Sequence, residues 1–543
     1  MRNRTLWKLF TVVPFLAAML LIGMIHMVML AREQVMPFAE PYGRATLLPE
    51  LASQAGPVQM TSPKTFAYRS GNELIYVKID NEGRSSSVVR SLPDSEFFQS
   101  YRLIGDGKAV WIGANNKLYT SEWKNGNWSP KKLLTETEMN GVQAIQGGTG
   151  KSVLLTYNDE ALFVGISSGD DAPNWIKLNA SGIKQVQGFM DKNGMLSAVY
   201  ATSREGNTGL HVVKLDTESG KTVVMEKLKD LELVNRYLED YTLYADNSLL
   251  RVAYTISSAK SGKSSLQMLT FPWDKPTDLQ DERIDLPSSE TSDSDTILQP
   301  IFSETDSGEA TLVVSSVYEK NRRMSSQEVY QLSFHETQLE SSTKISQFGG
   351  FAQYPNLAQE PDARIAVWLD PVNEASYRVY YATDQQPYQE RMNRLTADDL
   401  RTAAENLPLL WGISLVTWFL SLKWIFLPGI YLLVLSAFWQ HQYDSRQRLH
   451  FFISLAMYIV VKALFIQDYR KAVALQVMPE ALQPILVYLC MLIITALLAY
   501  VSTRQWRKGL NDRNIGLELF YFVLLDVFMT NLWYSYFMSP ATF

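Results

Sequence analysis

The sequence predicts an all-β seven-bladed β-propeller on the extracytoplasmic side of a membrane, carried by α-helical transmembrane segments. A hairpin pattern recurs at a spacing of roughly 45 to 60 residues, which is typical of repeat architectures. Long apolar stretches flank these repeats on both sides. The only cysteine of the 543 residues is Cys490, so the repeats must fold around an ordinary apolar core without disulfides. This fits a bacterial envelope protein better than a disulfide-rich secreted eukaryotic one.

Each repeat combines two strand-like apolar runs with a turn rich in Gly, Asn, Asp or Ser. Gly and Asn suit these turns because they tolerate a positive φ. Closing such hairpins into a ring leaves few exposed strand edges. The clearest copies are Thr65–Val77, Ala109–Tyr119 and Val153–Val164, and four more begin near Leu196, Leu250, Thr311 and Arg364.

Shorter apolar segments lie between the hairpins and predict the innermost strand of the following blade. With them, each unit has about four strands, and the seven hairpins predict seven blades. A pair of β-sandwiches is the alternative. The segments are Val142–Gln146, Ile183–Phe189, Tyr241–Tyr244 and Ile297–Phe302.

Two second strands end in the same exit turn, with an Asp, a short polar segment, a Gly and a basic residue. They are Leu74–Arg84 and Leu210–Lys221. This phrase resembles the blades of bacterial YVTN/PQQ/WD40-like propellers, and the resemblance covers most of residues 60–390. It implies the fold but no activity, because propellers serve as enzymes, scaffolds and sensors alike.

Charge divides the chain into three predicted domains. Residues 1–31 hold three basic residues and no acid, a net +3, and residues 401–543 hold eleven basic and seven acidic residues, a net +4. Since the whole chain carries −6, residues 32–400 carry −13. We expect an N-terminal signal-anchor helix in 1–31, an extracytoplasmic propeller in 32–400 and a four-helix transmembrane domain in 401–543. Nucleic-acid binding is not expected of so acidic a domain.

The apolar run Leu9–Leu30 is long enough to span a bilayer and follows a short basic leader. No Ala-x-Ala site follows it, which favours an uncleaved anchor over a signal peptide. Positive charge stays in the cytoplasm, so the N-terminus is predicted inside and the propeller outside in a multi-pass protein of the cell membrane.

Four apolar segments follow residue 406. The first is long enough for one tilted helix or for a tight hairpin around Lys423 or Pro428. One crossing is favoured because it keeps the two basic loops, around 446–448 and 504–513, in the cytoplasm. The segments are Leu407–Trp439, Leu449–Ile466, Pro484–Val501 and Leu517–Met538.

Two motifs in the propeller match enzyme signatures only in part. Gly165–Gly169 fits the serine-hydrolase pattern around Ser167, but no helix pattern follows it. The later histidines of this domain, His211 and His335, lie in strand-like runs. Gly262–Ser264 resembles the end of a phosphate loop whose first glycine is replaced by Ser257. Both are interpreted as hairpin turns, and no catalytic residue or cofactor is predicted.

The acidic segment Ser292–Thr296 offers oxygen ligands of the kind that Ca²⁺ prefers. It lacks the central glycine and terminal glutamate of a known calcium loop, so a solvated loop is the favoured interpretation. No paired-cysteine or His-Glu-x-x-His motif occurs in the sequence, and no metal site is predicted.

Ionisable residues inside the predicted membrane segments are the better candidates for a site. Asp526 and Lys462 are predicted at depths about 6 Å apart, within reach of a lysine stem. A paired charge costs less in lipid than a lone one. Thr530 shares the helix face of Asp526 at i+4. These three residues form the candidate intramembrane polar site, which either lies on a proton, ion or substrate path or is a structural pair between two helices.

Three functions remain open. The first is a non-enzymatic envelope protein whose propeller binds a protein or ligand as a scaffold or sensor. The second is a transporter or membrane-assembly component with an accessory propeller. The third is an exported hydrolase or lyase built on the propeller. The poor catalytic inventory and the large polar domain favour the first function, and the lipid bilayer is its other expected partner.

Overall fold

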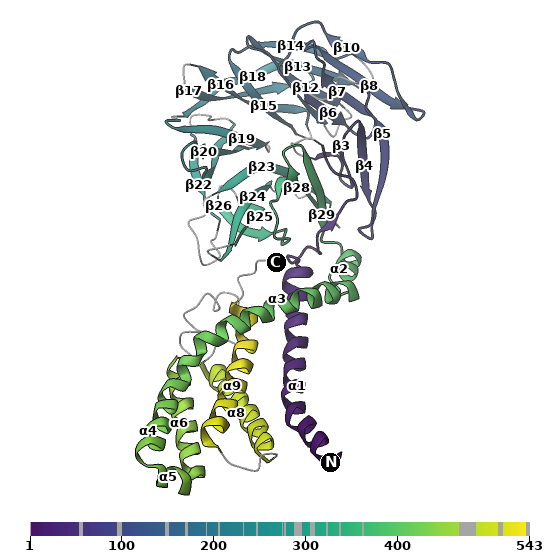
Figure 1. The fold of residues 1–543 in the computed structure, drawn as a ribbon. Coiled ribbons are helices and arrows are strands. Elements are labelled where there is room, and N and C mark those ends of the chain that lie inside the picture. Colours follow the sequence, from purple (N-terminus) through teal and green to yellow (C-terminus); the bar gives the residue numbers. More distant parts are fainter. Residues whose placement is uncertain are drawn as a thin grey trace. The chain divides into compact units, whose positions relative to one another are not determined.

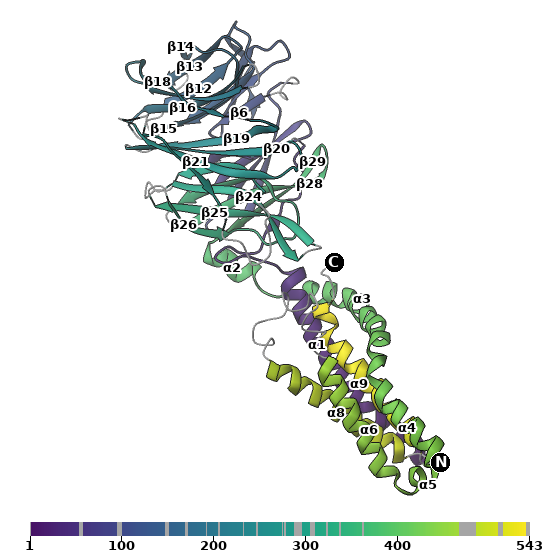
Figure 2. The same cartoon turned by 90° about the vertical axis from the view of Figure 1, so that its left-hand side faces the viewer.

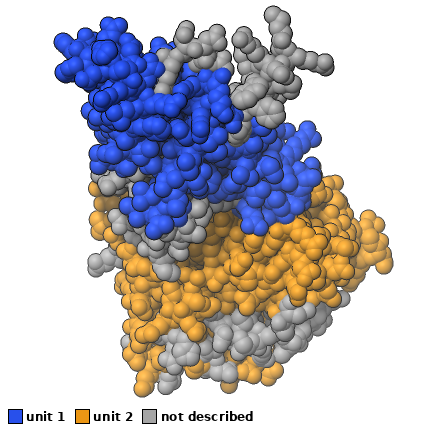
Figure 3. Space-filling view, turned by 90° about the horizontal axis from the view of Figure 1, so that it is seen from below, with its two compact units in different colours: residues 1–37, 321–324, 395–543 blue, residues 38–320, 325–394 orange. Residues whose placement is uncertain are grey.

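The computed structural model describes residues 2–538, apart from 54–57, 95–99, 147–150, 169–171, 192, 205–206, 232, 246–247, 274, 276–277, 287–295, 305–309, 322–323, 336–337, 361–362, 466–484 and 509–513. The chain forms two compact units (Figure 3). Unit 1 holds residues 1–37, 321–324 and 395–543, and unit 2 holds residues 38–320 and 325–394.

Unit 2 is a seven-bladed β-propeller, as predicted (Figure 1). In its described residues the strands form seven antiparallel sheets, one per blade, and the first six sheets run through their main strands in chain order. Blade 1 has β2 (Gln59–Ser62), β3 (Thr65–Ser70), β4 (Glu73–Ile79) and β5 (Ser85–Ser91). Blade 2 has β6 (Ser100–Ile104), β7 (Lys108–Ile112), β8 (Leu118–Lys124) and β10 (Lys132–Thr135), with β9 (Asn127–Trp128) beside β8.

The next three blades repeat the order. Blade 3 has β11 (Gly141–Gln146), β12 (Lys151–Tyr157), β13 (Ala161–Ser168) and β14 (Asn174–Asn179). Blade 4 has β15 (Ile183–Met190), β16 (Met195–Arg204), β17 (Asn207–Asp216) and β18 (Lys221–Leu231). Blade 5 has β19 (Arg236–Ala245), β20 (Leu249–Ser258), β21 (Ser264–Pro272) and β22 (Gln280–Ile284).

Blade 7 differs in that its outermost strand comes from the start of the unit. Blade 6 has β23 (Ile297–Glu304), β24 (Ala310–Asn321), β25 (Met324–His335) and β26 (Gln338–Lys344). Blade 7 has β27 (Gln353–Glu360), β28 (Ala363–Asn373), β29 (Ser376–Thr383) and then β1 (Thr46–Leu47). The predicted inner segments fall within β11, β15, β19 and β23, each the first strand of its sheet.

Apolar side chains fill the seams between neighbouring blades. Seven separate clusters of buried residues occupy the seven seams of the described ring, including the seam between blades 7 and 1. The first strands also contact one another around the ring, and β2 contacts both β6 and β27. Trp111 on β7 and Trp368 on β28 are fully buried at matching positions of the second strand. The continuous apolar runs of the hairpins therefore reflect strands that are covered on both faces.

The ring closes at blade 7 through a clasp made by β1, β29 and α2 (Gln386–Met392). Thr46 and Leu47 pair with Tyr381 and Tyr380. The Tyr388 hydroxyl of α2 lies 2.5 Å from the carbonyl oxygen of Arg44, to which it donates, and 2.7 Å from Thr46 Oγ1. An N-terminal strand thus covers the edge that blade 7 would otherwise expose.

The exit turns place glycine where the backbone needs a positive φ. In the turn between β4 and β5, Asp80 Oδ1 accepts the amide hydrogens of Glu82 and Arg84, and Gly83 has a φ of +70°. Hydrogen bonds from these two amides, that of Arg84 above all, lower the pKa of the Asp80 carboxyl. This is the Asx-type chemistry that makes Asp and Gly turn residues.

Unit 1 is helical. It contains α1 (Arg2–Leu30), the π-helical turn η1 (Ala31–Val35), α3 (Ala397–Ser421), the 3₁₀ turn η2 (Leu422–Ile425) and α4 (Phe426–Phe438). It continues with α5 (Gln440–Ser445), α6 (Gln447–Phe465), α8 (Ile485–Lys508) and α9 (Ile515–Met538). The apolar side chains that face one another among these helices form one core cluster.

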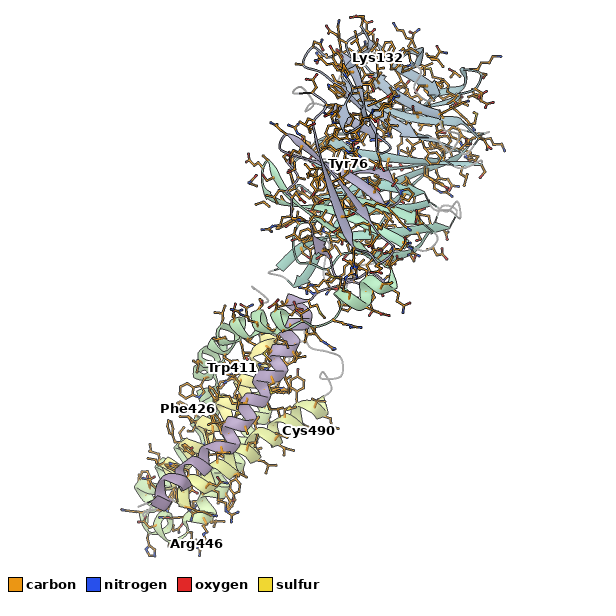
Figure 4. All side chains as sticks on the ribbon, turned by 90° about the vertical axis from the view of Figure 1, so that its right-hand side faces the viewer. Tyr76, Lys132, Trp411, Phe426, Arg446 and Cys490 are labelled. Atoms are coloured by element: carbon orange, nitrogen blue, oxygen red, sulfur yellow. The ribbon has the colours of Figure 1, made fainter. Side chains whose placement is uncertain are left out.

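The helices of unit 1 give the stretch 407–439 a single passage along the unit. The N-terminus of α1 lies at the same end of unit 1 as α5 (Figures 1 and 2). Trp411, Phe426 and Arg446 follow one another along the unit, and Arg446 lies at the α5 end (Figure 4). The chain leaves unit 1 after η1 and returns to it at α3, and these two elements contact each other.

Three described helices, α6, α8 and α9, are long and apolar enough to cross a membrane. Two shorter apolar helical stretches, Phe15–Leu30 and Lys423–Phe438, lie in α1 and in η2–α4. The four predicted C-terminal segments thus coincide with helices. Their bounds differ most at α3, which begins at Ala397, ten residues before the predicted start at Leu407. Helix α8 runs seven residues beyond the predicted end at Val501.

Candidate functional site

The structure brings together the three residues of the predicted intramembrane site. Lys462 on α6 and Asp526 on α9 form an ion pair, with 2.7 Å between Nζ and Oδ2, and both side chains have no exposed surface. Thr530 Oγ1 lies 2.7 Å from Lys462 Nζ. The site lies inside unit 1, where α6, α8 and α9 meet.

The Lys462 ammonium uses all three of its hydrogens. It donates to Asp526 Oδ2, to Thr530 Oγ1 and, at 3.2 Å, to Thr495 Oγ1 on α8. An ammonium has three donors and no acceptor. Its charge also lies 5.7 Å from the centre of the Trp424 ring, within the range of a cation–π contact. The protein thus replaces the hydration of this ammonium completely.

Two threonine hydroxyls are oriented to accept from Lys462. Thr530 donates its own hydrogen to the backbone carbonyl of Asp526 at 2.7 Å, and Thr495 donates to the carbonyl of Leu492 at 3.2 Å. Each hydroxyl then turns its oxygen lone pairs towards the ammonium. Backbone carbonyls three or four residues earlier on a helix are the usual acceptors for Ser and Thr. This pre-orientation suits an ammonium at Lys462.

Asp526 is held unsymmetrically. Its Oδ2 accepts from Lys462 and also from the Tyr458 hydroxyl, at 2.6 Å. Its Oδ1 is buried and has no hydrogen-bond partner among the described residues. A carboxylate has room for about four hydrogen bonds, so one oxygen of this ion pair keeps its capacity to bind a proton or a water molecule.

Two members of the site, Tyr458 and Thr495, are absent from the sequence prediction. Tyr458 lies four residues before Lys462 on α6, a spacing that places both on one helix face. This signal was present in the sequence. Thr495 carries no comparable signal, because its role depends on the rotation of α8 against α6. The neighbouring Asn531 does not belong to the site and exchanges hydrogen bonds with Ser421 instead.

A second candidate site lies on the propeller, where three consecutive blades share one irregularity. The first strands β19, β23 and β27 each carry a bulge near their start, where three steps along the first strand match two along the second. These bulges lie between Leu238 and Tyr241, Leu298 and Ile301, and Gln353 and Asn356. A shorter register shift lies near the start of β15 in blade 4. Because the innermost strands run in the same direction, the three bulges lie on one face of the ring. Bulges are over-represented next to active and binding sites.

Backbone strain accompanies two of these bulges. Gln299 has a φ of +54° and Tyr354 a φ of +50°, and each precedes a proline. Residues with bulky side chains rarely adopt this conformation, and the residue before proline normally prefers an extended one. Gln299 Oε1 accepts the backbone hydrogen of Tyr354 at 2.5 Å and so links blades 6 and 7. Strain of this kind clusters at functional sites.

The third bulge carries two adjacent carboxylates. Burial, reinforced by the neighbouring Glu239 charge, raises the pKa of Asp240 to about 6. Glu239 accepts a hydrogen bond from the Ser257 hydroxyl. Burial also raises the pKa of Tyr354, and the charges of Tyr377, Asp240 and Glu239 add to this effect. Perturbed groups of this kind are typical of functional sites.

Large apolar side chains are exposed near the bulges. Tyr237, which precedes the blade 5 bulge, is 49% exposed, and Phe351, which precedes the blade 7 bulge, is 54% exposed. Tyrosine and phenylalanine are enriched at protein interfaces. We call the surface around the three bulges, with Tyr237 and Phe351, the bulge face.

The partial motifs resolve into ordinary β structure. Ser167 lies within β13 rather than in the predicted hairpin turn, because the hairpin strand extends to Ser168, and its hydroxyl lies 2.7 Å from that of Ser152. Gly262 occupies a turn with a φ of +66°, as predicted. His211 lies on β17 and His335 on β25.

The possible calcium segment, Ser292–Thr296, lies outside the described residues except for Thr296. Among the residues that the structure does describe, no group of three or more His, Cys, Asp or Glu is placed to hold a metal ion.

Comparisons with known proteins identify no family. No family model matches the chain, and no curated protein matches it in sequence. A protein of unknown function from Dyadobacter fermentans is 12% identical over 62% of this chain and 99% of its own, with a TM-score of 0.35. The N-terminal domain of Nup159 is 12% identical over 64% and 97%, with a TM-score of 0.36. An ulvan lyase of polysaccharide lyase family PL25 is 10% identical over 66% and 99%, with a TM-score of 0.39.

Proposed function

We propose that this is an integral membrane protein whose extracytoplasmic propeller binds a protein or ligand of the cell envelope through its bulge face. The observation that carries the proposal is the set of bulges in three consecutive blades. Two hold strained residues, Gln299 and Tyr354, and the third holds the Glu239–Asp240 pair. Backbone strain persists only where the surrounding structure imposes it, and strained residues cluster at functional sites. A binding surface at the bulges would explain why the strain is retained.

Crosslinking in intact cells tests this proposal. A photoreactive phenylalanine analogue at Phe351 or Tyr237 should give a discrete crosslinked product, because both side chains are exposed on the bulge face. The control position is Val88, which is 57% exposed on the outer strand β5. A product of equal yield from Val88, or none from Phe351 and Tyr237, contradicts the proposal.

The proposal places the N-terminus in the cytoplasm and the propeller outside. It is supported by the arrangement of unit 1, where the basic N-terminus and the Arg446 end share one end of the unit. Positively charged loops stay in the cytoplasm. Unit 2 is inserted between η1 and α3, which contact each other.

Cysteine labelling tests the orientation. In a Cys490→Ser background, His441→Cys in α5 and Arg504→Cys in α8 should react with an impermeant thiol reagent only after the membrane is opened. Val88→Cys on the propeller should react in intact cells. Labelling of His441→Cys and Arg504→Cys in intact cells would invert the proposed orientation.

A role for the helices beyond anchoring is the second candidate function, namely a transporter or membrane-assembly component. The observation that favours it is the unbonded Oδ1 of Asp526, which is buried beside a Lys462 ammonium whose three hydrogens are all engaged. Ionisable residues are rare inside membranes, and those that occur there often mark ion and proton pathways. A structural pair is the competing interpretation, and the variants described in the Discussion separate the two.

A further inference from the structure

Polar side chains follow one face of α6 along most of its length. His450, Ser454, Tyr458 and Lys462 recur at four-residue spacing, and all four are buried. Such a spacing keeps side chains on one slowly turning stripe. At about 1.5 Å per residue, the stripe extends roughly 18 Å. An apolar helix that spans a membrane needs no such stripe for packing.

Several polar atoms along this stripe have no partner among the described residues. They are His450 Nε2, Ser454 Oγ and Asp526 Oδ1, joined by Ser502 Oγ of α8. The other ring nitrogen of His450 lies 2.7 Å from the Tyr431 hydroxyl. Buried polar atoms are almost always hydrogen-bonded, and buried water usually supplies the bond where the protein does not.

The unbonded atoms fall into an order along the helices. His450 lies near the α5 end of α6, and Ser454 lies one turn further on. Lys462 of α6 contacts Thr495 of α8, so these two residues lie at the same depth. Ser454 comes eight residues before Lys462, and Ser502 comes seven residues after Thr495. Since α8 runs opposite to α6, the two serines lie at a similar depth. The rings of Phe452 and Tyr500, 6.2 Å apart, bring the helices together at that depth.

We propose that a one-sided path of water enters unit 1 beside His450, passes Ser454 and Ser502, and delivers protons to Asp526. The path ends there because the Lys462 ammonium, with its three hydrogens engaged, closes it beyond Asp526. In the delivery step, an O–H bond of a hydronium breaks, a new O–H bond forms on Asp526 Oδ1, and a water molecule remains. Oδ2 keeps its bonds to Tyr458 and Lys462.

The chemistry of the path favours protons over metal cations. The titratable groups that face Asp526 are Lys462 and Tyr458, both from α6, while α8 contributes Thr495 and η2 contributes Trp424 near the ammonium. A metal cation at Oδ1 would meet the positive charge of Lys462. Hard cations also need six or more oxygen ligands. A proton needs one acceptor and a chain of hydrogen bonds.

The inference rests on the insertion of unit 1 into a membrane, and not on ligand binding by the propeller. Its test uses the full chain in sealed vesicles with Cys490→Ala as background. Ser454→Cys should react with a membrane-impermeant methanethiosulfonate added from the N-terminal side, because a hydrated thiol ionises and a thiol in lipid does not. The matched control is Ala456→Cys, on the exposed face of the same helix.

The expected result is modification of Ser454→Cys about tenfold faster from the N-terminal side than from the other side, and about tenfold faster than Ala456→Cys. Ser502→Cys on α8, with the exposed Leu497→Cys as its control, repeats the measurement should Ser454→Cys fold poorly. No reaction from the N-terminal side, or equal reaction of the controls, would overturn the path.

Proton delivery has its own readout. Infrared spectra of the reconstituted protein should gain a protonated-carboxyl absorption as the pH is lowered, and this band should shift in D₂O. The part of the band that comes from Asp526 should be missing in Asp526→Asn and present in Asp398→Asn, where the replaced carboxylate is exposed at the start of α3. A band unaffected by Asp526→Asn would overturn the delivery step and leave the propeller proposal untouched.

Discussion

At the scale of single residues, the Lys462–Asp526 pair depends on both of its charges. Replacing one partner leaves the other charge buried with no counter-charge, which costs about 3–5 kcal/mol in proteins. Lys462→Gln or Asp526→Asn should therefore lower the thermal stability of the purified protein in detergent. The double variant should recover most of this loss, because no unpaired charge remains.

The same variants distinguish the two roles of the pair. A structural pair predicts that the double variant regains both its stability and the crosslinked product at the bulge face. A pair that serves a function predicts that the double variant regains its stability but not the crosslinked product. Single variants as stable as the parent protein would mean that Lys462 and Asp526 do not form the ion pair in the purified protein.

Asp240 makes the stability of the propeller depend on pH. Its pKa rises from 3.8 to about 6 on folding, so the folded protein holds the proton more tightly than the unfolded chain does. The contribution of Asp240 is therefore greatest below about pH 4 and is lost as the pH rises through 6. Two pKa units correspond to about 2–3 kcal/mol.

We expect Asp240→Asn to raise the free energy of unfolding by about 2 kcal/mol at pH 7.5 and to have little effect at pH 4. Denaturant unfolding of the parent protein and the variant at both values measures this difference. Glu282→Gln replaces an exposed carboxylate of the same blade and is the control. An equal effect of Asp240→Asn at both values would show that Asp240 does not titrate in this range.

The pairing of Lys462 with Asp526 follows from the sequence because only depth and charge decide it. Two opposite charges at similar depth in lipid form a pair when a lysine side chain is long enough to bridge the distance between them. The hydroxyls of Tyr458 and Thr495 could not be assigned this way, because helix rotation determines which hydroxyl reaches the ammonium. Asp240 could not be singled out either, since its burial depends on a bulge whose register is set by β20.

At the scale of elements, the exit turn after β4 combines two constraints on one glycine. Gly71 and Gly83 both have a positive φ, but a Cβ at Gly71 would meet nothing within 4 Å. A Cβ at Gly83 would lie 2.6 Å from Tyr388 Cβ. The two positions therefore separate the cost of the backbone conformation from the cost of the contact.

Gly71→Ala should lower the free energy of unfolding by about 1 kcal/mol through its backbone conformation alone. Gly83→Ala should lower it by about 2–4 kcal/mol, because α2 must also move away from blade 1. Urea unfolding of the two variants gives the comparison. Equal losses would mean that Tyr388 yields at no cost.

The hairpins and their turns were open to prediction because their signals are local. The period-two patterns and the Gly, Asn and Asp residues identify them without tertiary information. The strand β1 has only two residues, Thr46 and Leu47, too few for any periodicity. The bulges in β19, β23 and β27 depend on pairing with the next strand, which no local pattern specifies.

At the scale of the whole molecule, the clasp determines which fragment of the chain contains everything that a stable propeller requires. Residues 38–394 include β1, the seven blades and α2, whereas residues 53–394 lack β1 and the buried Tyr42. The longer fragment should be soluble without detergent and should unfold cooperatively. The shorter one should aggregate or unfold at a lower temperature, since β29 would become an open edge.

Size-exclusion chromatography and thermal unfolding of the two fragments make this comparison. It also tests the predicted boundary between propeller and membrane helices, because residues 395–400 were assigned to the propeller domain and lie in unit 1. Equal stability of the fragments would show that the ring closes without its clasp.

The clasp also affects the order in which the propeller can assemble during synthesis. In the clasp, the hydroxyls of Thr46 and Tyr388 form a hydrogen bond, although the two residues are 342 positions apart in the chain. At synthesis rates of roughly 5–20 residues per second, β1 leaves the ribosome tens of seconds before its partners exist. The ring therefore stays open while six blades take shape, and its last seam can form only when synthesis has nearly reached α3. Any delay in the synthesis of α2 leaves β1 unpaired for the same interval, and unpaired strand edges are prone to aggregation.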